Sequence, residues 1–147
     1  MSDWSRKAAQ LVQMNRDAKL IQNKKAIQEQ EIYRRRAPEL WKQLTDLIQQ
    51  KCTDFNSEQG MSNTLKFSGE KANEFIVNQT DNTLKGDFDS TNHRFNFVSS
   101  TWTPAHFKLE VRVGEGYSDA VIVDEKEAPI DLELFVNIQL ESLLGIS

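Results

Sequence analysis

The chain has 147 residues, of which 38% are hydrophobic and 27% charged, and its formal net charge is −4. This length suffices for one domain with its own core, and the composition is that of a soluble globular protein rather than a disordered or membrane protein. No apolar run approaches the roughly 20 residues that a membrane-spanning helix needs, so we expect no membrane segment.

The amino-terminal residues contain no apolar block of the kind found in secretory signal peptides. Cys52 is the single cysteine, so the chain cannot form an internal disulfide. Both features are typical of a protein of the reducing cytoplasm, and we predict that location.

The two parts of the chain carry opposite charge. Residues 1–51 have 11 Lys and Arg against 6 Asp and Glu, a balance of +5, whereas residues 52–147 have 7 against 16, a balance of −9. The simpler interpretation is complementarity within the molecule or between subunits. The more specific interpretation is that the basic segment binds nucleic acid or another acidic partner, but the net acidic charge of the chain argues against it.

Residues 3–36 lack proline and glycine and are rich in helix-forming residues, so they predict a long helix. Its apolar stripe is thin and follows a coiled-coil-like register, in which Trp4, Leu11, Ala18 and Ile32 recur at multiples of seven. Lys25 and Gln28 interrupt this register. Met14 and Ile21 follow Leu11 and Ala18 by three residues. A helix with so little apolar surface is marginal alone in water, so we expect it to pack on the body, on a second copy or on another protein.

Three adjacent arginines, Arg34, Arg35 and Arg36, precede Ala37 and Pro38. Proline is disfavoured inside a helix and tolerated at its first position, so the sequence predicts a helix end near residue 36 and a new helix over 38–56. One continuous helix with a kink at the proline is the alternative. In the first case the arginines would interact favourably with the helix carboxyl end, and Glu31 would pair with Arg34 or Arg35.

The segment 38–56 has the clearest helical periodicity. An apolar stripe recurs at spacings of three and four and comprises Leu40, Trp41, Leu44, Leu47, Ile48, Cys52 and Phe55. This pattern predicts a core helix in which Cys52 is a small buried hydrophobic residue.

From residue 65 onward the period changes to two. Alternating apolar residues, separated by turn-forming residues, predict six strands marked by Leu65 and Phe67, Phe75 and Val77, Leu84 and Phe88, Phe95 and Phe97, Phe107 to Val113, and Val121 with Val123. Short connections and one-sided alternation indicate an antiparallel meander. Trp102, in the irregular segment before the fifth strand, is interpreted as a lid over the edge of the core.

The carboxyl-terminal segment predicts a final helix, with Asp131 as its N-cap and Gly145 as its terminator. The fold class is therefore α+β: a long N-terminal helix, a second amphipathic helix, a six-stranded antiparallel meander sheet, and a C-terminal helix packed on one sheet face. We divide the chain into a helical extension, residues 1–36, and an α+β domain, residues 37–147.

Catalytic motifs are not recognisable. His93 and His106 do not have the spacing of metal ligands, and Asp87, Asp89 and Glu110 would join them only if the fold brought them together. The phosphate-binding loops and the nucleophile elbow are missing from the sequence. We therefore assign no catalytic, metal or cofactor-binding residue, and expect a protein that is not an enzyme.

The sequence supports two hypotheses. The first is a protein-interaction module whose basic N-terminal helix mediates self-association or docking of a protein partner through Trp4, Leu11, Met14, Ala18, Ile21 and Arg34 to Arg36. The alternative is an enzyme or a binding protein that holds a small hydrophobic ligand in a cavity between a curved sheet and the helices.

Overall fold

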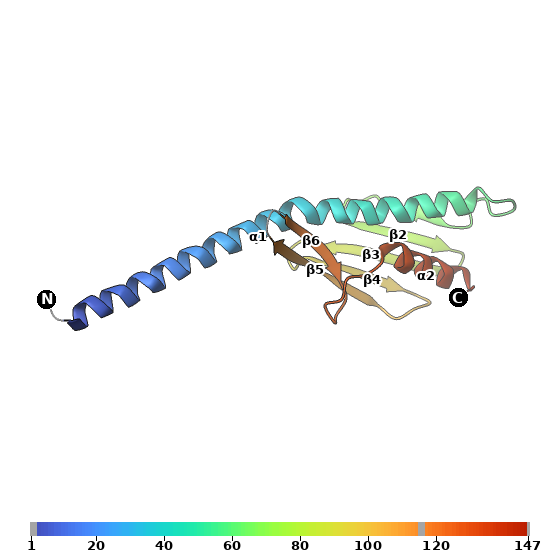
Figure 1. Ribbon diagram of the computed structural model, residues 1–147. Coiled ribbons are helices and arrows are strands. Elements are labelled where there is room, and N and C mark those ends of the chain that lie inside the picture. Colours follow the sequence, from blue (N-terminus) through green and yellow to red (C-terminus); the bar gives the residue numbers. More distant parts are fainter. Residues whose placement is uncertain (1–2, 115–116, 147) are drawn as a thin grey trace.

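The computed structural model describes residues 3–114 and 117–146 (Figure 1). Within these residues the chain forms two helices and six strands. Their bounds are α1 Asp3–Asn56, β1 Lys66–Ser68, β2 Glu74–Gln79, β3 Asn82–Asp89, β4 Arg94–Ser99, β5 Ala105–Gly114, β6 Tyr117–Val123 and α2 Leu132–Leu144. The predicted α+β class, with a long N-terminal helix and a six-stranded antiparallel sheet, is confirmed.

The helix α1 continues through Pro38, so the predicted separate helix over 38–56 is wrong. The alternative, a continuous helix that bends, is observed: the axis of α1 changes direction close to the start of β6 (Figure 1). Packing on the body explains why the proline does not end the helix. Ile32 and Ala37 before it are buried in the same core as Leu40 and Trp41 after it, which offsets the backbone hydrogen bond that Pro38 cannot donate.

The sheet is a meander in which β1 to β6 pair in chain order, every pair antiparallel. One face carries the core, as the period-two alternation predicts. In the last strand Ala120 and Ile122 face the core cluster and Val121 is only partly buried, whereas Val123 is buried. The pairing of Leu109 with Ile122 fixes this register.

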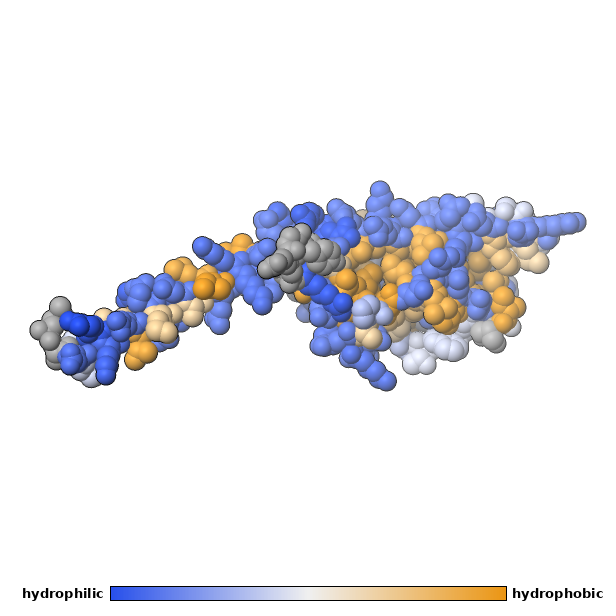
Figure 2. Space-filling view, viewed as in Figure 1, coloured by the Kyte–Doolittle hydropathy of each residue, from blue (hydrophilic) through white to orange (hydrophobic). Residues whose placement is uncertain are grey.

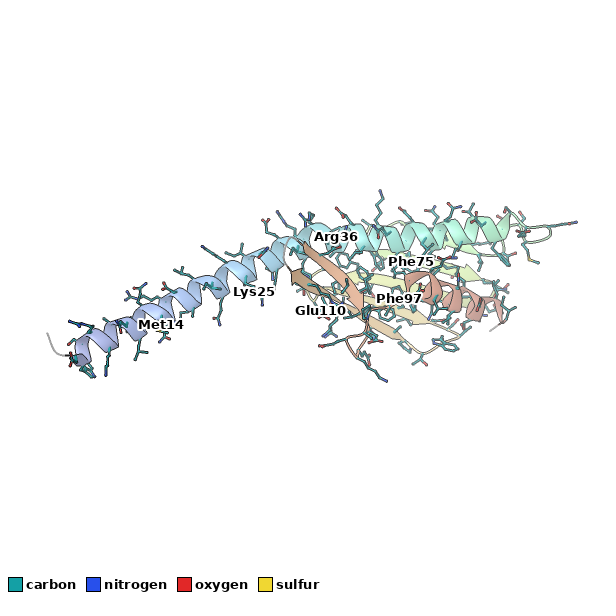
Figure 3. All side chains as sticks on the ribbon, viewed as in Figure 1. Met14, Lys25, Arg36, Phe75, Phe97 and Glu110 are labelled. Carbon is teal, nitrogen blue, oxygen red and sulfur yellow. The ribbon has the colours of Figure 1, made fainter. Side chains whose placement is uncertain are left out.

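Both helices pack on the core face of the sheet. Trp41 of α1 lies 5.1 Å from Phe95 between ring centroids, and Phe135 of α2 lies 4.9 Å from Phe97. Phe75 and Phe97 lie between α1 and the sheet in Figure 3. The helix stripe predicted for 38–56 therefore forms the core, as expected.

The end signals predicted for the last helix are confirmed. The Asp131 side chain accepts a hydrogen bond from the backbone N–H of Leu134, and Gly145 ends α2 with φ 72° in the left-handed region. Trp102 is 50% exposed, and its role as a lid over the edge of the core stays a prediction.

Candidate interaction surface

The first half of α1 projects beyond the sheet as an arm, which we define as residues 3–31 (Figure 1). Every residue of the arm is exposed or only partly buried, and Ile32 is the first buried residue of the helix. At about 1.5 Å per residue the arm extends about 43 Å. Figure 2 shows hydrophobic side chains gathered on the body and scattered among hydrophilic ones along the arm.

Five residues on one side of the arm form what we term the seam: Trp4, Leu11, Met14, Ala18 and Ile21. Their large members are strongly exposed, by 77% for Trp4, 61% for Leu11, 66% for Met14 and 67% for Ile21. The spacing of seven and three residues places them in two adjacent rows of the helix surface. The five residues face the same side of the arm, and two lysines occupy further positions of the same register, Lys7 between Trp4 and Leu11 and Lys25 closer to the body.

Two contacts of the arm join side chains that lie three or four residues apart. Within it, the Gln13 side chain donates a hydrogen bond to Asp17 over 3.1 Å, and Glu31 at its end pairs with Arg34 over 3.5 Å. Pairs of this kind contribute only about 0.2–0.5 kcal/mol each. The arm is therefore an extension of a helix anchored by its second half, and its apolar side chains have no core to enter.

The three arginines lie inside the helix, so their predicted interaction with a helix carboxyl end is wrong. Arg36 instead donates to Asp119 of β6 over 2.6 Å and also pairs with Glu39 on the next turn. The predicted pairing of Glu31 with Arg34 is confirmed, and Arg35 is exposed. The three side chains thus point in different directions, and Arg36 joins α1 to the sheet where the arm leaves the body (Figure 3).

The ion pair changes the acid–base properties of its partners. Burial alone would raise the pKa of Asp119, but hydrogen bonds from Arg36 and from the backbone N–H of Ala120 outweigh it and lower the pKa. The hydrogen bond to Asp119 raises the pKa of Arg36. Asp119 was not singled out in the sequence, because it lies 83 residues from its partner.

An open, mainly apolar groove of about 630 Å³ lies where the arm meets the body. Tyr33 and His93 stack along it, with ring centroids 4.0 Å apart and planes within 6° of parallel. The Tyr33 hydroxyl donates to the backbone carbonyl of Leu109 over 3.1 Å. The groove also has Ile27 and Phe88 in its lining, so it continues the apolar surface of the arm onto the body.

The two histidines have separate environments. His93 stacks on Tyr33, whereas the Nδ1 of His106 lies 2.7 Å from the side-chain oxygen of Asn96. Over the residues that the structure describes, His, Cys, Asp and Glu side chains form no group of three suited to hold a metal ion. Cys52 is buried as predicted, and burial raises the pKa of its thiol to about 11.

The comparisons with known proteins give no relative: no family model, no curated protein and no solved structure matches the chain. Across the described part of the chain, the helices are too short or too polar for a bilayer crossing. The arguments for function therefore depend on the arm and its seam.

Proposed function

We propose that this protein is a non-enzymatic interaction module whose basic N-terminal helix mediates self-association or the docking of a protein partner. The observation that carries the proposal is the arm, along which four large apolar side chains on one side are each more than 60% exposed. The body, in contrast, encloses its aromatic residues between α1, α2 and the sheet.

Burial of these side chains supplies the driving force for association. Fully burying a Leu, Ile or Met side chain contributes about 1.5–3 kcal/mol. A helix that a folded body already holds in place loses less conformational entropy on binding than a disordered segment does. The arm therefore presents a preformed apolar stripe, which is the pattern that helices use to bind in grooves or to pair with other helices.

Charge sets the preference among partners. The net charge of −4 disfavours binding driven by nucleic-acid phosphates. Cations around the seam, such as Lys7 and Lys24, favour a protein surface that offers carboxylates at its rim. We place this association in the cytoplasm, where a single free cysteine such as Cys52 stays reduced.

Substitutions in the full-length chain test the proposal. The double variant Leu11→Glu with Ile21→Glu puts two charges into the seam. Val12→Glu with Leu20→Glu is a matched control, since these neighbouring residues are also exposed and apolar but lie off the seam. We expect the seam variant alone to lose association, measured by light scattering after size exclusion and by affinity capture of partner proteins.

Equal association by the wild-type chain and both variants would contradict the proposal. The seam residues are exposed, so the body should fold alike in all three proteins, and near-identical thermal midpoints verify this. The alternative, a cavity for a small hydrophobic ligand between sheet and helices, has less support, because Phe75, Phe95 and Phe97 fill that space.

A further inference from the structure

We infer that the partner of the seam is the seam of a second copy of this chain, packed against it in antiparallel orientation. This inference rests on the proposed function and makes it specific. It follows from the size and charge of the residues at each seam position. A two-fold axis between residues 12 and 13 relates the two arms. The position of this axis determines which residue of the second copy lies opposite each seam residue.

In a coiled-coil register that begins at Trp4, the first and fourth heptad positions are Trp4, Lys7, Leu11, Met14, Ala18 and Ile21. Antiparallel packing places each first position opposite a fourth position of the partner. The resulting layers are Trp4 on Ile21, Lys7 on Ala18 and Leu11 on Met14, each occurring twice.

The sizes in these layers are complementary. The largest side chain, Trp4, lies at the end of the interface opposite a β-branched residue, and two residues of similar size meet at its centre. Lys7 lies opposite Ala18, the smallest seam residue. The lysine stem can therefore cover the alanine while its ammonium group reaches water.

Charges beside the seam are also complementary. The flanking positions that meet in this register are Asp3 with Lys24 and Gln10 with Asp17 of the other copy. The first is an ion pair and the second a hydrogen-bonding pair, and the two-fold axis generates each twice. No flanking pair in this register joins like charges.

The parallel arrangement also offers a flanking ion pair, Lys24 with Glu29 of the other copy, but it lacks the match of sizes between opposing seam residues. It would stack Lys7 on Lys7 and, farther along, Lys25 on Lys25 of the other copy. Two like charges at seam positions oppose that pairing, as polar residues at such positions do in other coiled coils. The same residues therefore favour antiparallel pairing and disfavour parallel pairing.

The projecting arm provides room for the arrangement. Asp3 of the second copy would lie beside residue 22, about 15 Å short of Ile32, where the body begins. The two bodies would lie at opposite ends of a rod, with their Ile32 residues about 58 Å apart along the axis. Neither body obstructs the other arm.

The interface is small, with six layers, and lies at the lower end of the range for specific association. We therefore expect a concentration-dependent equilibrium between monomer and dimer.

Sedimentation equilibrium of the full-length chain should show the average mass rising with protein concentration from 16.9 kDa towards twice that value. Leu11→Glu with Ile21→Glu should weaken association at least tenfold, while Val12→Glu with Leu20→Glu should change it less than threefold.

Cross-linking determines the orientation. The variants Asp3→Cys and Lys24→Cys are each treated with a short bismaleimide reagent, separately and as an equimolar mixture. Cys52 is buried and should not react. We expect a covalent dimer in the mixture only, because antiparallel packing separates like positions by roughly 30 Å along the axis.

Each other outcome overturns the inference in a recognisable way. A dimer whose cross-links join like positions excludes the antiparallel orientation but leaves the proposed function intact. A chain that stays monomeric at the highest attainable concentration excludes the second copy as partner. The proposed function also fails if, in addition, no captured protein depends on the seam.

Discussion

Gly86 gives the sharpest test of the packing that anchors the arm. It pairs with Phe75 across β2 and β3, and the Phe75 ring lies over it. A Cβ added at residue 86 would lie 2.5 Å from Cζ and 3.0 Å from Cδ1 of that ring, and closer still to Cε1. Carbon atoms in contact prefer separations of about 3.5–4.0 Å, so Gly86→Ala requires the ring to move.

The ring has little space to move. Phe75 is buried, and its ring centroid lies 5.6 Å from that of Trp41, 6.0 Å from Phe67 and 6.2 Å from Phe97. Overpacking of such a core costs about 1–3 kcal/mol and sometimes more. Backbone propensity alone would predict that Gly86→Ala stabilises the fold. Glycine in the middle of a strand is destabilising by about 0.5–1 kcal/mol relative to alanine.

The two terms together lead us to expect that Gly86→Ala lowers the free energy of unfolding by about 2 kcal/mol, out of the roughly 5–15 kcal/mol typical of a domain. Urea titration followed by the fluorescence of the buried Trp41 measures this change. Gly69→Ala is the control, since its added Cβ would lie 3.2 Å from a Phe67 ring that is only partly buried. Gly86→Ala together with Phe75→Leu should recover part of the loss. An unchanged or higher stability of Gly86→Ala would refute the reasoning.

Three further predictions concern the helix and its junction with the sheet. Asp119→Asn should lower the free energy of unfolding by about 1 kcal/mol at pH 7, because its ion pair with Arg36 is partly exposed. Because the pKa of Asp119 is lower in the folded state, its ionised carboxylate stabilises the fold at pH values above the unfolded-state pKa. The free energy of unfolding of the wild-type chain should therefore decline as the pH falls below about 4, and that of Asp119→Asn should decline less. Urea titrations over a pH series measure both free energies. Cys52, whose pKa is raised to about 11, should not react with a thiol reagent at pH 8 until denaturant unfolds the chain, and rapid labelling of native protein would contradict its burial. Pro38→Ala should raise the free energy of unfolding, by up to about 3 kcal/mol, because it permits the missing backbone hydrogen bond; a decrease would mean that the bend itself is needed to seat α1 on the sheet.

The strands were predictable where apolar and polar residues alternate. In β5, Phe107, Leu109 and Val111 alternate with polar residues, and all three belong to the core or pack against it. In β6 the sequence Ala-Val-Ile-Val offers apolar residues on both faces. Only the pairing with β5 selects Ala120 and Ile122, so pattern alone could not identify the buried face.

The end of the first helix was not predictable from local preferences. Pro38 disfavours a helix interior, and that preference is correct in isolation. Packing of Ile32, Ala37 and Trp41 in one core overrides it. The spacing of the seam, in contrast, was visible in the sequence, because exposed residues on a regular helix depend only on the helical period. The contact between Arg36 and Asp119 depends on the folded arrangement of distant segments and has no local signal.

Because one continuous helix begins in the arm and ends in the body, its length sets both the distance of the apolar stripe from the body and the direction in which the stripe faces. Each residue added between Ile21 and Ile32 would lengthen the reach by about 1.5 Å and rotate the outer portion by about 100°. Inserting seven residues would thus keep the apolar stripe facing its original direction at a greater distance, whereas inserting two would turn it to nearly the opposite side. The spacing and facing of whatever binds the stripe are set by the number of residues in that stretch.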